Sequence, residues 1–420
     1  MKKKIDAFGD ASIKVPFIIP EITKNDKNAV LNALNSRLLT DGPKLHKFES
    51  IFAKFTGTRF AVGVSNGTAA LHLSLKALGI GNGSEVIIPD ITFVATASSV
   101  LLTGATPVLV DVDEDLNISI PSIKKSITAK TKAIIPVHFA GKSCKIKEIA
   151  SIARKNHIAI IEDCAHAIGA RVNSKHVGTF GQSGCFSFYP TKNFTTIEGG
   201  MVITNSKNVA DFVRSARNHG ISKTLASRFS GGKPWDYDIE NPGYNYRLDE
   251  IRASLGINQI KRIKKMNLLR KKASNYYTKK LGNVNGVVVP DKSISAEHVH
   301  HLYVIRITRK YGITRDMLFQ KLLKSGIRTS VHYKPLHRFT TFKKMARVFG
   351  SLSNSKDAYS QILSLPIYPS ISKKQQDLVI SNIEKYKGWS KYLLVDFIRQ
   401  CYYWKLRDKS YENNCRHSGL

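Results

Sequence analysis

The stretch Val62-Gly63-Val64-Ser65-Asn66-Gly67-Thr68-Ala69-Ala70-Leu71 passes from a short apolar run through a small polar turn into a helical pattern. The same alternation recurs along the chain from about residue 26 to 210. Short β-rich runs are predicted at 60–64, 85–89, 107–112, 133–137, 158–161 and 184–188. Helix-period stretches lie between them, at 69–78, 94–102, 146–155 and 209–217. Alternation of this kind predicts an α/β domain with a mostly parallel sheet.

A second, smaller α/β unit is predicted in the C-terminal half. Apolar residues recur at Ile251, Leu255, Ile260 and Ile263, so a long helix is expected from about 248 to 280. A strand at 302–307, a helix at 315–324 and a last helix at 373–386 follow it. The predicted organisation is an N-terminal segment (1–25), a large domain (26–265), a small C-terminal domain (266–387) and an extension (388–420). The extension is aromatic and basic, and we expect it to pack on its own domain rather than on a membrane or a partner.

The composition is that of a folded chain without a membrane span. The protein has 420 residues, of which 42% are apolar, and it contains no uninterrupted run of about 18 apolar residues. Its basic start is not followed by the apolar core of a secretory signal. Five cysteines without a CxxC pair suit a reducing cytoplasm better than a disulfide framework.

The charge is unusual. Sixty-five Lys and Arg residues against 31 Asp and Glu residues give a formal net charge of +34. Such a field attracts nucleic acid, acidic lipid headgroups or a phosphorylated small substrate. The basic residues are dispersed, however, and no block of five or six like charges occurs, so we favour the interpretation that they are solvated surface lysines.

Three segments lie where the carboxyl ends of parallel strands gather functional groups. In the first, the turn Ser65-Asn66-Gly67-Thr68 brings the free N–H groups of a new helix to one point, which outlines a phosphate site. An ordinary capping turn has the same composition, so this segment alone does not decide between the two interpretations.

The second segment ends an apolar strand in two carboxylates, Glu162 and Asp163, followed by His166. A buried carboxylate at the rim needs a cationic partner, which a pyridinium nitrogen, an arginine or a metal ion can provide. His138 and His166 raise the metal alternative, but no metal-ligand spacing supports it, and we predict no metal.

In the third segment, a strand delivers Ser187 and, five residues later, Lys192 to the same edge. A lysine among apolar and aromatic residues can have a depressed pKa and react as a Schiff-base amine, although a lone lysine after a strand is usually a surface residue. The ordered combination of phosphate turn, rim aspartate and strand-end lysine changes that balance. Together these parts can hold pyridoxal 5'-phosphate.

With these residues in place, the chain resembles the DegT/StrS-like nucleotide-sugar aminotransferases over roughly residues 14–387. The resemblance rests on nine segments in colinear order: 39–43, 65–72, 89–96, 136–141, 162–167, 187–193, 243–248, 331–337 and 363–366. It implies the fold-type-I architecture of aspartate aminotransferase, with a large, mostly parallel seven-stranded sheet domain and a smaller C-terminal α/β domain. It also implies a homodimer with shared active sites.

The resemblance assigns roles to individual residues. Lys192 would form the Schiff base with pyridoxal 5'-phosphate, and Asp163 would pair with the pyridinium nitrogen. The remaining cofactor contacts would come from a stacking ring, a histidine near the ring hydroxyl and a set of phosphate ligands: Phe93, His166, Gly67, Thr68, Ser187 and Asn245, the last from a second subunit. Tyr333 and His337 match a segment that approaches the sugar substrate. A simpler interpretation of Asn245 is that it caps the helix expected near residue 248.

The implied activity is transfer of an amino group, from L-glutamate, to a keto-sugar linked to a nucleotide diphosphate, for amino-sugar and surface-glycan biosynthesis. One alternative is a sugar dehydratase of the same family, but that branch lacks the Schiff-base lysine, which is present here as Lys192. Another is a cofactor-free basic binding or regulatory protein, which would bind polyanions with a steep salt dependence.

Overall fold

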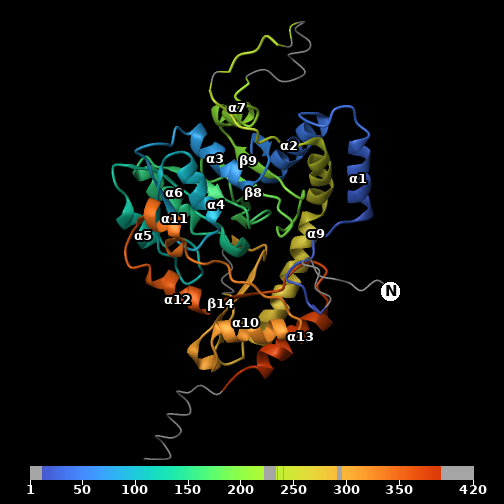
Figure 1. The fold of residues 1–420 in the computed structure, drawn as a ribbon, viewed down its shortest axis with the longest axis vertical. Coiled ribbons are helices and arrows are strands. Elements are labelled where there is room, and N and C mark those ends of the chain that lie inside the picture. Colours follow the sequence, from blue (N-terminus) through green and yellow to red (C-terminus); the bar gives the residue numbers. More distant parts are fainter. Residues whose placement is uncertain (1–11, 222–232, 234, 240, 291–295, 389–420) are drawn as a thin grey trace, which may run out of the picture.

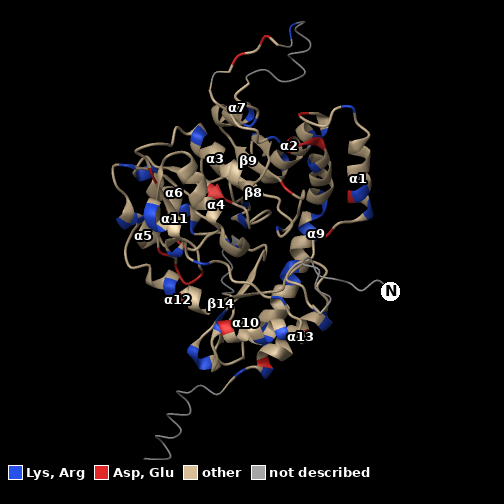
Figure 2. Ribbon diagram, in the orientation of Figure 1, with Lys and Arg blue, Asp and Glu red and all other residues tan. Residues whose placement is uncertain are grey.

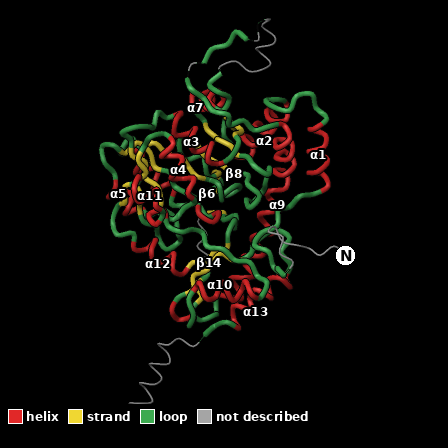
Figure 3. The backbone as a smooth tube through the Cα atoms, viewed as in Figure 1, coloured by secondary structure: helices red, strands yellow, loops and turns green. Residues whose placement is uncertain are grey.

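The fold is seen in a computed structural model that describes residues 12–221, 233, 235–239, 241–290 and 296–388 (Figure 1). All of the C-terminal extension except Gly388, and residues 1–11 of the N-terminal segment, lie outside the described residues. The tube in Figure 3 shows helices around a central group of strands, with a second group of elements below it.

The central sheet has eight strands in the order β1-β9-β8-β5-β4-β2-β3-β13. Neighbouring strands from β8 to β13 run parallel, whereas β9 is antiparallel to both β1 and β8. The predicted seven-stranded, mostly parallel sheet is therefore confirmed, and a two-residue eighth strand joins its edge. The strands are β1 (Phe60–Val64), β2 (Glu85–Pro89), β3 (Thr106–Val110), β4 (Thr131–Ile134), β5 (Ala159–Asp163), β8 (Ser183–Ser187), β9 (Gly200–Thr204) and β13 (Arg347–Val348).

No strand is predicted from the sequence at β9, the antiparallel partner of β8. Its apolar run Met201-Val202-Ile203 follows Gly199-Gly200 and returns the chain along β8 instead of crossing over through a helix. Strand–helix alternation does not signal such a return, which is why the pattern misses this strand.

Helices cover both faces of the sheet because successive strand residues point to opposite sides. Val86 and Ile88 of β2 face one core, under α3, α4 and α7, whereas Ile87 between them faces the core under α5 and α6. On that second face, α2 and α9 cover the half of the sheet formed by β1, β9 and β8. These helices are α2 (Pro43–Thr56), α3 (Gly67–Ala77), α4 (Val94–Leu102), α5 (Ile120–Ser126), α6 (Ile146–Lys155), α7 (Lys207–Ala216) and α9 (Glu250–Leu281), and α1 (Lys24–Leu34) lies along α9.

The second unit is a three-stranded antiparallel sheet with its own core. The sheet consists of β10 (Val287–Val288), β12 (Tyr303–Ile307) and β14 (Ile362–Leu365). Apolar residues of α10 (Arg315–Lys324) and α13 (Lys373–Lys385) fill the core together with the C-terminal half of α9. The chain between β12 and β14 also forms α11 (Thr340–Met345), β13 and α12 (Ser353–Gln361). A separate small sheet consists of β6 (Arg171–Val172), β7 (Lys175–His176) and β11 (Ala296–Glu297).

Helix α9 joins the two units. Its apolar residues up to Met266 belong to the core under the large sheet, and those from Ala273 onward belong to the core of the small unit. The predicted boundary at 265/266 thus falls inside a continuous helix, and it stays a prediction.

Lys and Arg residues are spread over the helices of both units (Figure 2). None of the described helices is long and apolar enough to cross a membrane.

A buried carboxylate fixes the N-terminal ends of α2 and α9 to one another. Glu250, in the first turn of α9, accepts hydrogen bonds from the backbone N–H groups of Gly42 (3.2 Å), Lys44 (2.8 Å) and Leu45 (2.8 Å). Helix α2 has no side-chain cap of its own. Glu250 therefore replaces the missing cap from a site more than 200 residues away in the sequence.

We expect Glu250→Ala to lower the free energy of unfolding by about 2–3 kcal/mol, because three backbone donors lose a charged acceptor. Urea unfolding followed by circular dichroism measures this loss. The matched control is Glu384→Ala on the exposed surface of α13, which should stay within about 0.5 kcal/mol of wild type. Equal effects of the two substitutions would contradict the capping role of Glu250.

Candidate active site

The predicted phosphate turn is formed where β1 ends and α3 begins. The side chain of Asn66 accepts a hydrogen bond from the N–H of Ala69 (2.8 Å), so the turn does cap its helix, as an ordinary capping turn would. Gly67 also lies directly against Ser187 at the end of β8, since a Cβ on Gly67 would come within 2.9 Å of the Ser187 Cβ. The first N–H groups of α3, Thr68 and the Ser187 hydroxyl therefore meet at one place, which suits an anion.

Asp163 ends β5 at the same edge of the sheet. Its carboxylate accepts hydrogen bonds from the Thr96 hydroxyl (2.9 Å) and from the N–H of Ala165 (3.1 Å). Burial raises the pKa of Asp163, and these two donors and the Lys192 amine oppose that shift. The carboxylate thus needs a cationic partner to stay ionised.

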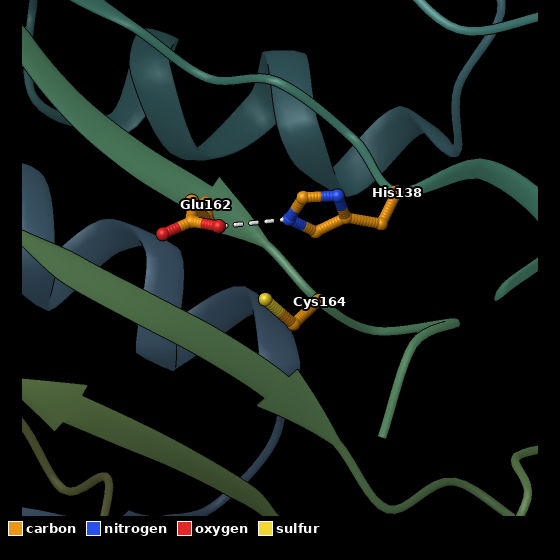
Figure 4. A group of neighbouring side chains, drawn as sticks. All are labelled: His138, Glu162 and Cys164. Carbon is orange, nitrogen blue, oxygen red and sulfur yellow. Dashed lines mark hydrogen bonds and ion pairs between the residues drawn. The ribbon is translucent and has the colours of Figure 1, made fainter. Parts of the chain in front are cut away.

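The neighbouring Glu162 faces a different group of residues (Figure 4). It accepts hydrogen bonds from His138 Nε2 (2.9 Å) and from the N–H groups of Gly178 (2.7 Å), Phe180 (2.6 Å) and Gly181 (2.9 Å). Candidate ligand atoms of His138, Glu162 and Cys164 all lie within 4.8 Å of one another.

That geometry alone would suit a metal ion, but the candidate ligand atoms of Glu162 and His138 already form hydrogen bonds within the protein. Both Glu162 oxygens accept from N–H groups, and His138 Nδ1 faces the N–H of Cys144 at 3.3 Å. An ion would have to displace these bonds in a fully buried place. We therefore interpret the group as a hydrogen-bonded support of the strand ends, not as a metal site.

Lys192 follows β8, and its backbone N–H donates to the carbonyl of Tyr189 (2.9 Å). The residue as a whole is half-buried, and its amine is the buried end. Burial lowers the pKa of Lys192 to about 8, while the Asp163 carboxylate opposes the shift. Lys192 and Asp163 thus influence each other's protonation, as expected for groups at the same edge of the sheet.

His166 and Tyr333 form one wall of this edge. The Tyr333 hydroxyl and His166 Nε2 are 2.9 Å apart, and the two rings stack with centroids 5.9 Å apart. Burial, together with Lys192 and His332, lowers the pKa of His166 well below its usual range, so its ring is neutral. His166 Nδ1 is buried and has no partner in the described part of the chain.

Phe93 precedes α4 and is 55% exposed. Its ring lies 5.9 Å from that of Tyr333. An aromatic face of this size, left open beside Tyr333, is available to stack on a flat ring.

His337 and Asn245, the two other predicted site residues, have different surroundings from each other. His337 is held at the end of β2, where its N–H and Nδ1 contact the two oxygens of Asp90 at 2.9 and 2.7 Å. Asn245 is exposed and forms a β-bridge with Asn218. The interpretation of Asn245 as a helix cap is wrong, because Asp249 caps α9 through the N–H of Arg252 (2.8 Å).

Sequence reasoning missed three residues of the site. Thr96 lies in the quoted 89–96 segment without an assigned role, and its contact with Asp163 depends on the docking of α4 against β5. Asn193 lies in the 187–193 segment, also without an assigned role. His301 lies with its ring centroid 4.4 Å from that of His166, although 135 residues separate them, and no sequence signal links them.

These residues fit pyridoxal 5'-phosphate. The Gly67 turn offers an anion cradle that a Cβ would fill, Asp163 offers a buried counter-charge, and Lys192 offers an amine of lowered pKa. The unpartnered Nδ1 of His166 leaves one polar atom free for a ring substituent.

Comparison with known proteins identifies the family. Residues 20–384 match the DegT/DnrJ/EryC1/StrS aminotransferase family. The spore coat polysaccharide biosynthesis protein SpsC of Bacillus subtilis is 38% identical over 376 residues, which cover 88% of this chain and 96% of SpsC.

Two solved structures are similar throughout. One is PseC of Helicobacter pylori, an aminotransferase of pseudoaminic acid biosynthesis, with 29% identity, a TM-score of 0.83, and coverage of 89% of this chain and 99% of PseC. The other is the putative sugar aminotransferase Spr1654 of Streptococcus pneumoniae in its PLP form, with 30% identity, a TM-score of 0.82, and coverage of 89% and 98%.

The chain belongs to the DegT/DnrJ/EryC1/StrS aminotransferase family. The predictions of family, fold-type-I architecture, pyridoxal-phosphate cofactor and sugar-aminotransferase class are confirmed.

The lowered pKa of Lys192 has a direct consequence for its reactivity. A lysine with a pKa of about 8 has roughly a tenth of its amine neutral at pH 7, against roughly one part in 3,000 for an ordinary lysine. In cofactor-free protein we expect Lys192 to react with a small amine-directed reagent half-maximally near pH 8. Peptide mass spectrometry after labelling across a pH series measures this midpoint, and a value near 10 would contradict the burial of the amine.

Proposed function

We propose that this enzyme transfers an amino group from L-glutamate to the keto carbon of a sugar linked to a nucleotide diphosphate, for amino-sugar and surface-glycan biosynthesis. The observation that carries the proposal is the convergence of Lys192, Asp163 and the Gly67–Ser187 anion turn at one edge of the sheet. Family membership and the sugar-related relatives support the sugar substrate.

The bound cofactor supplies an aldehyde that links to an amine and a ring that accepts electrons. Lys192 would hold the cofactor covalently and, once released, would move a proton between the substrate carbon and the cofactor. Its pKa of about 8 suits this task, because the amine can both accept and return a proton near neutral pH.

Asp163 would hold the proton of the ring nitrogen. Hydrogen bonds from Thr96 and from the N–H of Ala165 hold its carboxylate in one orientation, so the group is preorganised before the cofactor binds. Gly67, Thr68 and Ser187 would bind the phosphate through neutral donors, while Phe93 would cover one ring face and His166 Nδ1 would meet the ring hydroxyl.

Tyr333 stands between Phe93 and His166 and would contact the sugar. His337 is bound through Nδ1 to Asp90, so it would approach a substrate only through Nε2. The two roles are proposed together because both side chains belong to the segment that follows Val331.

We further propose a homodimer in which Asn245 reaches the cofactor phosphate of the partner. Asn245 is exposed, as a residue that serves a second subunit must be in a single chain. Large apolar side chains are also exposed on and after α1, namely Leu31, Leu34, Leu38 and Leu39. Such residues mark an interface when they lie together.

A cytoplasmic location is proposed as well. Cys144, Cys164 and Cys185 are buried free thiols, which is the state that a reducing compartment maintains.

The activity is tested by incubating the purified protein with pyridoxal 5'-phosphate, L-glutamate and a panel of UDP-, dTDP- and GDP-keto-sugars, with NMR of the product. We expect an amino-sugar from wild type and from the exposed control Lys207→Ala, but none from Lys192→Ala. Asp163→Asn should lose on the order of 10²–10³-fold in turnover, because an amide cannot hold the ring proton. Borohydride reduction and peptide mapping should place the cofactor on Lys192, and an adduct on another lysine would contradict the proposal.

Shared sites are tested by mixing two inactive variants, Lys192→Ala and Asn245→Asp, whose new carboxylate should repel the phosphate. In a heterodimer with shared sites, one site carries both lesions and the other carries neither. Random exchange should therefore restore about a quarter of wild-type activity. No recovery despite demonstrated subunit exchange would exclude completion by the partner.

A further inference from the structure

Asn193, the residue after Lys192, is buried. It lies in the loop between β8 and β9 (residues 188–199, here called the Lys192 loop) and connects this loop to the segment before β12. Its Nδ2 donates to Asn267 Oδ1 on α9 (2.8 Å) and to the carbonyl of Val299 (2.9 Å). Its Oδ1 lies 3.0 Å from His301 Nδ1. Both polar atoms of this side chain therefore form hydrogen bonds with residues outside the Lys192 loop.

The orientation of the Asn193 amide follows from backbone carbonyls, which only accept hydrogen bonds. The Val299 carbonyl requires the NH₂ group of Asn193 on its side. Asn267 Nδ2 donates to the carbonyl of Ile168 (3.0 Å), so Asn267 Oδ1 is likewise an acceptor for Asn193. The oxygen of Asn193 must then face His301, and His301 Nδ1 must carry the hydrogen.

This assignment makes His301 a neutral ring with its hydrogen on Nδ1. Burial is the largest cause of the lowered pKa of His301, and the neighbouring His166 and Lys192 also oppose its protonation, which agrees with the neutral form. The backbone holds the residue from both sides, since its N–H donates to the Ala140 carbonyl (2.9 Å) and its carbonyl accepts from Arg270 Nη1 (3.3 Å).

We propose that Asn193 and His301 are positioning residues, and that the hydrogen bond between them tethers the Lys192 loop and keeps the lysine amine buried opposite Asp163. The proposal rests on the proposed role of Lys192 and adds two residues to which no role in the site has been assigned. Neither residue touches the reacting atoms, and both act through the position of Lys192.

The titration of Lys192 reports on this tether. The titratable groups around Lys192 come from several elements. Asp163 and His166 at the end of β5, His301 before β12 and His332 next to Tyr333 interact electrostatically with Lys192. Glu21 and Arg270 line the same small cavity as Lys192. Burial is the largest cause of the lowered pKa of Lys192, and Asp163 opposes it. A loop that relaxes toward solvent loses that burial, so the pKa of Lys192 should rise.

The experiment compares variants that separate the hydrogen bond from the ring. His301→Phe keeps an aromatic ring but removes the donor, and Asn193→Ala removes the acceptor. His301→Asn removes the ring but offers an amide N–H near the position of Nδ1, so it is the matched control. In cofactor-free protein, the pH midpoint of Lys192 labelling should rise by about one unit in the first two variants and stay within about 0.3 unit of wild type in the third.

Steady-state kinetics gives a second readout. The first two variants should lose at least about ten-fold in kcat with little change in KM, because a displaced amine slows the reaction without altering substrate contacts. The double variant should be no worse than Asn193→Ala alone, since that substitution already removes the bond to His301. Asn267→Ala, which cuts the tether on α9, provides the same labelling test if Asn193→Ala does not fold.

The outcomes separate the two proposals. An unchanged labelling midpoint in folded Asn193→Ala and His301→Phe, or additive losses in the double variant, would overturn the tether. Absence of a cofactor adduct on Lys192 in wild type would instead overturn the proposed function.

Discussion

The site depends on holding a carboxylate and an amine of opposite charge together in a buried place. Burial pushes both Asp163 and Lys192 toward their neutral forms, raising the pKa of the first and lowering that of the second to about 8. Each opposes the shift of the other, and the Thr96 hydroxyl and the N–H of Ala165 help to keep the carboxylate ionised. Separating the two would leave each charge buried without its counterpart, at a cost of several kcal/mol. The ends of β5 and β8 must therefore stay in register, and parallel pairing of these two strands provides that constraint.

The histidines around this pair are arranged so that they add no further positive charge. Burial and the nearby Lys192 lower the pKa of His166, of His301 and of His332, the last to about 3. Burial also raises the pKa of Tyr333, so its hydroxyl stays protonated beside His166. The wall of the site thus consists of neutral hydrogen-bonding rings at neutral pH. Protonating any one of them would place a cation near Lys192 and depress its pKa further.

Much of the fold could be predicted because its signal is local. Strands β1 and β2 lie at the predicted residues, and α9 begins and ends within two residues of the prediction, since apolar periodicity decides each of them. What the pattern missed depends on pairing between distant segments. Strand β9 returns antiparallel along β8, and β13 comes from the second half of the chain to join the edge beside β3. Neither feature is written in the periodicity of a single segment.

In the candidate site, too, the residues with a local sequence signal could be predicted and the contacts between distant segments could not. Lys192 and Asp163 could be predicted because each ends or follows an apolar strand of a parallel sheet, where the topology fixes the edge. His301 and Asn193 meet across 108 residues, and Thr96 reaches Asp163 across 67, so these contacts follow only from the docking of α4, α9 and the segment before β12. The metal alternative around His138 likewise depends on contacts between distant segments. The four donors of Glu162 come from His138 and from a loop whose path the sequence does not reveal.

The net charge of the protein acts over long distances, whereas the groups of the phosphate turn act at contact distance and are neutral. At short range, the phosphate turn offers backbone N–H groups and hydroxyls from Thr68 and Ser187, and no lysine or arginine of the described chain is needed to form it. At long range, a net charge of +34 surrounds the site with a positive field. That field is screened within about 8 Å at physiological salt, so it would raise the rate of encounter with the proposed anionic sugar nucleotide more than the affinity of the bound state. The neutral donors proposed for the cofactor phosphate would then bind it without disturbing the balance between Asp163 and Lys192. A cationic phosphate site would lower the pKa of Lys192 further and weaken its use as a proton carrier near neutral pH.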